Sequence, residues 1–343
     1  MILAVIFFIA RWASAADVPT LDTLGQARRV LLSRGLVPSG QIWISHRELW
    51  VKRSVDALEG LERRHQQAIA KADEMLAANE AIRARLVLAE ESARTKGRTD
   101  TNRPHPSSAR QAGRTASPSS SAELTSQLPD VTGLGEQTPL QLAMIELANA
   151  RTALQLAVLR ITREAPRLEA EYKALESNTD VRSALEAIPP NARLGPASNY
   201  QREIVKAEAV RAVAFKSEIP GYFESGLFRL QTIVNEIQPV TFTLVKNGPS
   251  VVTASVAQQL GLPGRHTPRM QEMDLDGRRL AVYPVRLGEL RLGSIVIKNV
   301  AAVVLPPDAE DLGSRLSASS PTGYQATLHP RQMKLLLAPV TTK

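Results

Sequence analysis

Lys246 and Ser250 are the two residues of this sequence whose types and spacing come nearest to a nucleophilic catalytic pair. Some hydrolases use a serine hydroxyl that a neighbouring lysine activates. The two residues stand four positions apart in Lys246-Asn247-Gly248-Pro249-Ser250, and the Gly and Pro of this run are typical of a turn. A turn that carries ordinary polar residues explains the same run, so both interpretations stay open at this point.

Most other kinds of active site lack the residues that they need. The 343-residue chain has no cysteine, which excludes disulfides, thiolate nucleophiles and Cys-ligated metals. Its five histidines show no HxH, HxxH or HExxH spacing, so we expect neither a metal site nor a haem site. The sequence also lacks a Walker A loop, a GxSxG elbow and a GxGxxG fingerprint after a strand. We therefore expect no cofactor.

The first fifteen residues are typical of a signal peptide. Residues 1–10 are continuously apolar, and Ala13-Ser14-Ala15 ends the segment before Asp17. Ten residues rise about 15 Å in a helix, half of a bilayer, whereas a short apolar run that ends in an Ala-x-Ala site predicts cleavage. We expect cleavage after Ala15 and export to the periplasm or the exterior. No Lys or Arg precedes the run, so an uncleaved membrane anchor is the alternative.

Residues 16–93 are predicted to form an N-terminal helical region, in which a short helix and a turn at residues 38–40 precede a long helix. From residue 46 apolar residues recur at alternating spacings of three and four, the a/d pattern of a coiled coil. The a positions are Val51, Leu58, His65, Ala72, Asn79 and Leu86, and the d positions are Ser54, Leu61, Ala68, Met75, Ile82 and Ala89. Asn79 is a candidate for fixing register and oligomeric state. Packing within the same chain is the alternative to self-association.

Residues 94–137 are predicted to be a disordered basic linker. Ser, Thr, Pro and Gly fill most of the segment, and this composition buries too little apolar area to offset the chain entropy of folding. Its basic residues are Arg94, Lys96, Arg98, Arg103, Arg110 and Arg114. Because the whole chain has a net charge of +8, docking on an anionic surface is one interpretation, and a solvated tether is the other.

Residues 138–222 are predicted to form a second helical, coiled-coil-like region with a stronger seam. One set of seam positions is Leu140, Leu147, Leu154, Ile161, Leu168 and Leu175, and the other is Met144, Arg151, Val158, Ala165 and Tyr172. Pro166 is expected to kink or divide this helix, and a further short helix is expected over residues 201–217. The two helical regions could pair within one chain or between chains, and the sequence alone decides neither.

Near residue 225 the period of the apolar residues changes from 3.6 to 2, which predicts strands. We expect them over residues 227–235, 240–245, 278–287, 294–298 and 300–305, with a helix over 254–260 and a final hairpin over 324–337. About 115 residues are enough to bury one core. The predicted fold class is therefore α+β multidomain, in which long helices precede a C-terminal all-β domain over residues 225–338.

The order of motifs in this β domain resembles the retropepsin-like aspartic protease domains of bacterial exported proteins. That family has a strand, Asp-Thr-Gly-Ala-Ser, a hydrophobic pair and a helix that ends Leu-Gly-Leu. Here a strand, residues 246–250, Val251-Val252 and a helix ending Leu260-Gly261-Leu262 follow in the same order. The resemblance covers about a third of the chain and implies a retropepsin-like fold.

Within the five-residue motif, this sequence differs from the family at the residues that the catalytic chemistry needs. The resemblance implies a catalytic Asp at the position of Lys246 and a Thr or Ser at that of Asn247. Gly248 and Ser250 match, and Pro249 replaces a small residue. Aspartic proteolysis needs two carboxylates close enough to share a proton, and an ammonium group has no acceptor for that proton. We therefore expect a degenerate motif with no intact catalytic site.

Two other segments complete the resemblance. Asp276-Gly277 stands where the family's flap carries Asn-Gly or Asp-Gly, and Leu316-Ser317-Ala318 stands where Leu-Leu-Gly is expected. In the family each half of a dimer is expected to supply one Asp. Two Lys246 side chains that face each other across a two-fold axis would repel, which argues against that dimer.

Three functional hypotheses follow. The first is an exported, non-catalytic pseudoprotease that binds a peptide or protein, with strand addition as the mode of binding, or that acts as a scaffold. The second is an active retropepsin-like endopeptidase with an atypical site. The third is binding of an anionic polymer through the basic linker, although this linker has no aromatic residues for stacking on bases. Self-association through the coiled coil is compatible with each of them.

Overall fold

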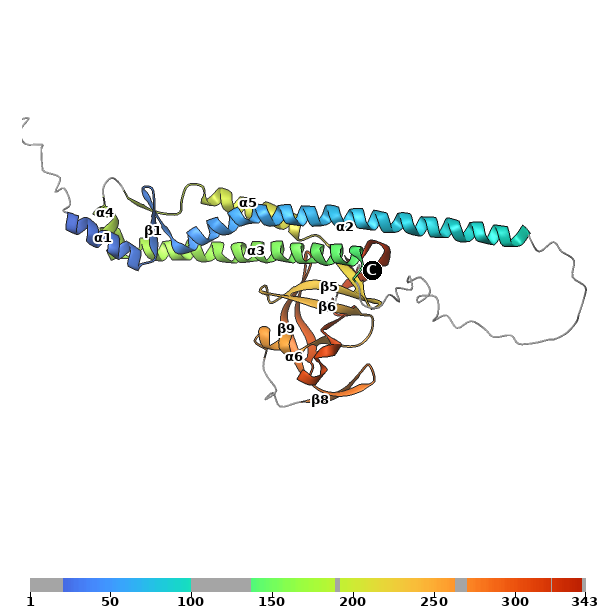
Figure 1. Ribbon diagram of the computed structural model, residues 1–343. Coiled ribbons are helices and arrows are strands. Elements are labelled where there is room, and N and C mark those ends of the chain that lie inside the picture. Colours follow the sequence, from blue (N-terminus) through green and yellow to red (C-terminus); the bar gives the residue numbers. More distant parts are fainter. Residues whose placement is uncertain (1–20, 100–136, 189–191, 263–269, 322, 341–343) are drawn as a thin grey trace, which may run out of the picture. The chain divides into compact units, whose positions relative to one another are not determined.

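The computed structural model describes residues 21–99, 137–188, 192–262, 270–321 and 323–340 (Figure 1). The predicted signal segment and residues 100–136 of the predicted linker lie outside this part of the chain. The protein divides into two compact units, one of residues 1–60 and 157–212 and one of residues 61–156 and 213–343. Two long helices, α2 (His46–Thr99) and α3 (Pro139–Glu176), contribute to both units.

Unit 1 combines helices with a small three-stranded sheet. Besides parts of α2 and α3 it contains α1 (Leu21–Ser33), β1 (Leu36–Ser39), β2 (Ile42–Ser45), α4 (Thr179–Glu186), β3 (Arg193–Leu194) and α5 (Tyr200–Ala214) except for its last two residues. Strands β1 and β2 form an antiparallel hairpin, and β3 runs parallel to β2. The sequence pattern predicts only a helix and a turn before residue 46. Strands of four residues or fewer carry almost no period-2 signal, which is why this sheet was not predicted.

Most of the seam positions predicted for α3 are buried, whereas the buried seam positions of α2 lie between residues 51 and 72. In unit 1 these are Val51 and Leu58 on α2 and Val158, Ile161, Leu168 and Tyr172 on α3. In unit 2 they are His65, Ala68 and Ala72 on α2 and Leu140, Met144, Leu147, Arg151 and Leu154 on α3. The expected division of α3 at Pro166 is wrong, because the helix runs past this exposed residue to Glu176.

Helix α3 is apolar as well as long. Among the described residues it is the one helix whose length and composition would allow it to cross a membrane. More than half of its most apolar window is buried inside the protein, and buried core helices have the same composition.

The rest of unit 2 is mainly one ten-stranded sheet. Its strands are β4 (Glu218–Glu224), β5 (Leu227–Val234), β6 (Gln238–Val245), β7 (Ser250–Val252), β8 (Gln271–Leu275), β9 (Arg278–Leu292), β10 (Ile295–Val304), β11 (Arg315–Ser317), β12 (Tyr324–His329) and β13 (Lys334–Pro339). Short helices are α6 (Ala254–Gln259), η1 (Pro307–Leu312) and η2 (Pro330–Gln332). The sheet starts at Glu218, whereas the sequence analysis assigned residues up to 222 to the helices, because Pro220-Gly221 was interpreted as a helix end.

Six of these strands close into a barrel. The strand order is β12-β13-β4-β5-β6-β11-β7-β10-β9-β8, and β5 also pairs with β9. The additional pairing joins Ile233 to Arg291 and Val234 to Leu290. Inside lie large side chains with almost no exposed surface, among them Leu230, Phe242 and Leu287. The all-β core predicted for the C-terminal part is thus confirmed.

Strand β11 has the topology that matters most for the candidate site. It lies between β6 and β7, parallel to β6 and antiparallel to β7. Leu316 pairs with Leu244 and Ser317 pairs with Val245, the last residue of β6. The segment that the sequence analysis aligned with Leu-Leu-Gly is therefore placed directly beside the loop that carries Lys246.

Candidate functional site

The loop between β6 and β7 carries the five-residue motif that the sequence predicts to be degenerate. All four of its loop residues, 246–249, are exposed. Gly248 has a φ of 101°, a backbone conformation that glycine adopts far more readily than residues with a Cβ. Among the described residues no hydrogen bond or ion pair involves Lys246. Its ammonium group therefore projects from a tight turn into solvent.

Ser250 belongs to the barrel and not to a catalytic pair. Its side chain is buried, its Oγ accepts a hydrogen bond from the Ser317 backbone N–H at 3.2 Å, and the Ser250 and Ser320 hydroxyls are 2.6 Å apart. These contacts join the start of β7 to the end of β11. The geometry does not bring Ser250 and Lys246 together, so it gives no support to the Ser–Lys interpretation.

A second hydrogen-bonded contact fastens the other end of β11. The Ser314 carbonyl accepts a hydrogen bond from Thr243 N–H at 2.9 Å, and its Oγ accepts one from Thr253 N–H at 3.2 Å. Thr253 also caps α6 through Val256 N–H. All three polar side chains, on Ser314, Thr243 and Thr253, are buried. The sequence analysis overlooked them, although hydroxyl residues at the ends of apolar strands were the available signal.

The candidate flap is the hairpin of β8 and β9, whose turn is Asp276-Gly277. Both turn residues have positive φ, 53° and 78°, as a two-residue type I′ hairpin requires. Asp274 Oδ1 accepts a hydrogen bond from Gly277 N–H at 3.0 Å. Asp276 accepts two hydrogen bonds from the Arg315 guanidinium, one of them from Nη1 at 3.0 Å. The Arg315 hydrogen bonds hold the pKa of Asp276 below its ordinary value and raise that of Arg315.

The neighbouring carboxylates are also engaged in structural contacts. Asp311 forms an ion pair with Arg278 at 2.9 Å. Glu310 accepts hydrogen bonds from Ser255 N–H at 2.7 Å and Ser255 Oγ at 2.8 Å, at the start of α6. None of these partners is another carboxylate. The described part of the chain also has no group of three His, Asp or Glu side chains placed to hold a metal ion.

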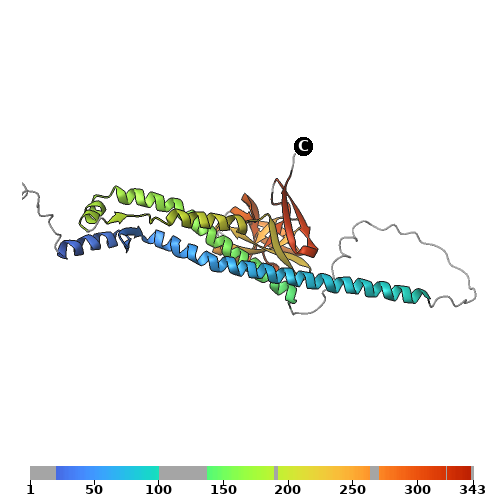
Figure 2. The same ribbon diagram turned by 90° about the horizontal axis from the view of Figure 1, so that it is seen from above.

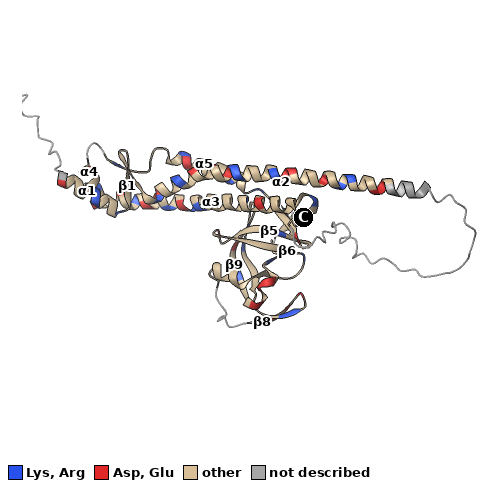
Figure 3. Ribbon diagram, in the orientation of Figure 1, with Lys and Arg blue, Asp and Glu red and all other residues tan. Residues whose placement is uncertain are grey.

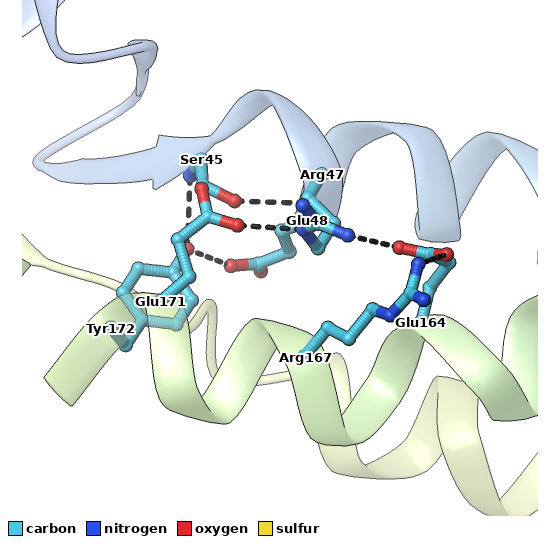
Figure 4. Close-up of polar contacts among 7 residues, drawn as sticks. All are labelled: Ser45, Arg47, Glu48, Glu164, Arg167, Glu171 and Tyr172. Carbon is cyan, nitrogen blue, oxygen red and sulfur yellow. Dashed lines mark hydrogen bonds and ion pairs between the residues drawn. The ribbon is translucent and has the colours of Figure 1, made fainter. Parts of the chain in front are cut away.

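A polar cluster in unit 1 joins α2 to α3 (Figure 4). The buried Glu48 carboxylate accepts hydrogen bonds from Tyr172 Oη and, at 2.8 Å, from Ala197 N–H. Tyr172 Oη in turn accepts one from Ser45 N–H at 3.0 Å. Burial, and then Glu48, raise the pKa of Tyr172 well above its ordinary value, so the phenol stays a donor.

An ion-pair network extends this cluster. Arg47 binds Glu171, with Nε and Oε2 2.7 Å apart, and also binds Glu164. Arg167 contacts the same Glu164 at 2.8 Å. Because α2 supplies Arg47 and α3 supplies Glu164 and Glu171, these two ion pairs fix the register of the two helices. Arg47 stands more than a hundred positions from both Glu164 and Glu171, which no spacing in the sequence reveals.

A buried arginine in unit 2 connects α3 to the chain between the end of α5 and the start of β4. Arg151 donates to the Lys216 carbonyl at 2.8 Å and to the Ala214 carbonyl at 3.4 Å, and Gln155 Nε2 also donates to the latter at 2.9 Å. Burial lowers the pKa of Arg151 to about 10. Burial, and then the charge of Arg151, lower the pKa of the buried His65. This cluster has a structural role, since carbonyl groups of the chain itself occupy its donors.

Comparison with known proteins finds a family match and a similar solved structure. Residues 246–320 match the family model described as aspartyl protease. A solved structure from Rickettsia conorii, described as a retropepsin-like aspartic protease, is similar at 19% identity with a TM-score of 0.29, over 35% of this chain and 96% of that one. No curated protein matches the chain. The family match begins at Lys246, the first residue of the predicted motif, and ends at Ser320, which contacts Ser250. The predicted resemblance to aspartic proteases is thus confirmed for residues 246–320, which lie in the all-β part of the chain.

Proposed function

We propose that this retropepsin-like domain is non-catalytic and binds a peptide or an unfolded protein segment, as part of an exported protein. One observation carries the proposal. The resemblance implies a catalytic Asp at the position of Lys246, and in the structure this lysine lies in an exposed loop. A carboxylate there would accept the proton of an attacking water, whereas a lysine ammonium has no lone pair to do so.

The engagement of the nearby carboxylates supports the proposal. Replacement of the missing Asp would require a carboxylate free to approach a second one and share its proton. Asp274, Asp276, Glu310 and Asp311 instead bind backbone N–H groups, a hydroxyl or arginines. Each would have to give up its present contacts before it could act on a water molecule.

The free edge of β8 is the surface that fits an extended peptide. Among the described strands, β8 is the last in the sheet order and pairs with β9 alone. Its exposed residues include Gln271, Glu272 and Asp274, whereas Met273 is half-buried against the apolar cluster around Leu275. A peptide added at this edge would gain main-chain hydrogen bonds and place alternate side chains over that cluster.

Proteolysis of an unfolded substrate between pH 3 and 8 tests the non-catalytic assignment. We expect the purified chain to be inert at every pH. A Lys246→Asp variant restores the carboxylate, and Lys298→Asp is the matched control because Lys298 is exposed on β10. Activity in Lys246→Asp alone would support the position assigned to the motif. Cleavage by the unmodified chain that Lys246→Ala abolishes would refute the proposal.

Binding is tested separately from catalysis. Hydrogen exchange of the full chain, with and without a library of unfolded peptides, should show new protection at residues 271–275. If peptides bind and protect other segments instead, the non-catalytic assignment stands but the β8 edge is wrong. If no peptide binds at any concentration tested, peptide binding is wrong.

An active peptidase is the second candidate, and the family match over residues 246–320 favours it. Such an enzyme would need a partner chain that supplies the carboxylate, or chemistry based on Lys246. The same proteolysis assay separates the two candidates.

Export is tested by N-terminal sequencing of the protein recovered outside the cytoplasm, which we expect to begin at Ala16.

A further inference from the structure

The C-terminal half of α2 carries an uncovered continuation of a buried helix seam. In unit 2, Ala68 and Ala72 of α2 pack with Leu140, Met144 and Leu147 at the start of α3. Figures 1 and 2 both show α2 continuing past the N-terminal end of α3. Ile82 and Leu86 lie on this extension and are 57% and 60% exposed. The described part of the chain therefore leaves the second half of the seam without a cover.

The uncovered residues keep the register of the covered ones. After Ala68, Ala72 and Met75, the alternating spacings of three and four continue with Asn79, Ile82, Leu86 and Ala89. We call these last four residues the α2 stripe. This a/d spacing puts the stripe on the face that α3 covers one turn earlier. Large apolar side chains at such positions are typical of a helix that packs on another helix.

We propose that the α2 stripe binds the same stripe of a second copy of this chain, with the two helices antiparallel. The direction follows from α3. In unit 2, His65 lies near Arg151 and Lys71 forms an ion pair with Glu146, so α3 runs antiparallel to α2. If α2 of the second copy is antiparallel, it runs in the same direction as α3 and lies beyond the N-terminal end of α3. If it is parallel, its own earlier turns fall in the place that α3 occupies.

The charges that flank the stripe suit this arrangement. Figure 3 shows basic and acidic residues alternating along the extension. Arg83 and Glu90 are one heptad apart at the same flanking position. When Leu86 lies opposite Ala89 of the second copy, Arg83 lies opposite Glu90 of the second copy, and two-fold symmetry repeats the pair. The residues that flank the stripe are therefore complementary to themselves in charge.

The contact is short, so the expected dimer is weak. About two heptads overlap, and an interface of this length falls well below the buried area of a standard stable complex. Sedimentation equilibrium over a wide concentration range is the suitable measurement, because it detects association in the micromolar range. We expect the purified full chain to change from monomer to dimer as its concentration rises.

Two substitutions of similar size test whether association depends on the stripe or on any exposed apolar residue of α2. Ile82→Glu places a charge in the stripe of both copies, and should weaken association about a hundredfold or more. Leu88→Glu is the matched control, since Leu88 is 62% exposed but lies on the opposite face of α2. It should leave association unchanged. Equal helical content by circular dichroism would show that both variants remain folded.

Charge reversal and cross-linking test whether the two α2 helices are antiparallel. Arg83→Glu should weaken association about threefold to tenfold, and adding Glu90→Arg should restore it. Because the chain has no cysteine, single-cysteine variants can be cross-linked without background. A mixture of Leu86→Cys and Ala89→Cys should form a mixed disulfide, whereas Asn79→Cys alone should form none.

Three results would overturn the proposal. A chain that stays monomeric at all concentrations would exclude the dimer, and equal loss of association in Ile82→Glu and Leu88→Glu would exclude the stripe as its interface. Efficient disulfide formation by Asn79→Cys alone would show a parallel pair and exclude the antiparallel arrangement.

Discussion

Replacing Arg315 with methionine should loosen the hairpin of β8 and β9 without unfolding the barrel. Arg315 reaches the hairpin turn from β11 and binds both carboxylate oxygens of Asp276. The arginine side chain is 16% exposed and the aspartate side chain 56%. Methionine keeps the apolar stem of Arg315 but removes both hydrogen bonds, so the change isolates the contact that holds the turn.

The exposure of Asp276 sets the size of the effect. Hydrogen bonds to charged groups are worth about 1.5–3 kcal/mol when buried, but exposed ion pairs are worth about 0–1 kcal/mol because water screens them. A bidentate pair with one buried partner lies between these cases, and we expect a loss of about 1 kcal/mol. If the hairpin opens locally, this corresponds to about a fivefold faster amide exchange.

Hydrogen exchange measured by mass spectrometry over residues 270–282 is the assay. Arg278→Met is the matched control in the same hairpin, because Arg278 and its partner Asp311 are both more than half exposed. It should change exchange by less than about twofold. Unchanged exchange in Arg315→Met, or an equal increase in Arg278→Met, would refute the idea that Arg315 holds the hairpin.

The lowered pKa of Asp276 gives this prediction a pH signature. The folded pKa lies below the ordinary value of 3.8, so the unfolded carboxyl binds its proton first as the pH falls. The stabilisation is therefore fully present above about pH 4 and is lost as the pH falls through the folded pKa. As the pH falls through this folded pKa, the protection of the hairpin amides from exchange should decrease in the unmodified chain but not in Arg315→Met.

Three further changes test other parts of the structure. Gly293→Ala should lower the free energy of unfolding by about 2–4 kcal/mol in urea titration, because its Cβ would lie 2.2 Å from the Lys216 carbonyl oxygen at a φ of 60°. Ser250→Ala should cost about 1–3 kcal/mol in the same assay by leaving the buried Ser317 N–H unpaired. The lowered pKa of His65 means that stability is fully present above about pH 6.5 and falls below it; in melting curves from pH 5 to 8, His65→Leu should remove this dependence.

The parts of the fold that repeat in sequence were predictable. The spacing of Leu140, Leu154 and Leu168 identified a helix face that is buried in the structure. The change to a period of two identified the barrel strands, because each presents one face to the core. The β1–β2 hairpin gave no such signal, since Pro38 interrupts a strand of four residues.

The candidate site was predictable only in part. The order of motifs placed Lys246 at the start of the segment that the family model matches. Contacts between distant residues could not be inferred, since Ser250 and Ser317 stand 67 positions apart and Asp276 and Arg315 stand 39 apart. Such contacts depend on the place of β11 in the sheet, which local sequence does not encode.

The place of β11 also determines when the barrel can form during synthesis. β6 and β7 follow each other in the chain but acquire their common neighbour only when residues 315–317 arrive. Until then both strands keep an unpaired edge, and closing this gap must overcome the loop entropy of about seventy residues. Barrel closure is therefore a late, long-range event, and the nascent domain stays open until almost its whole length has emerged.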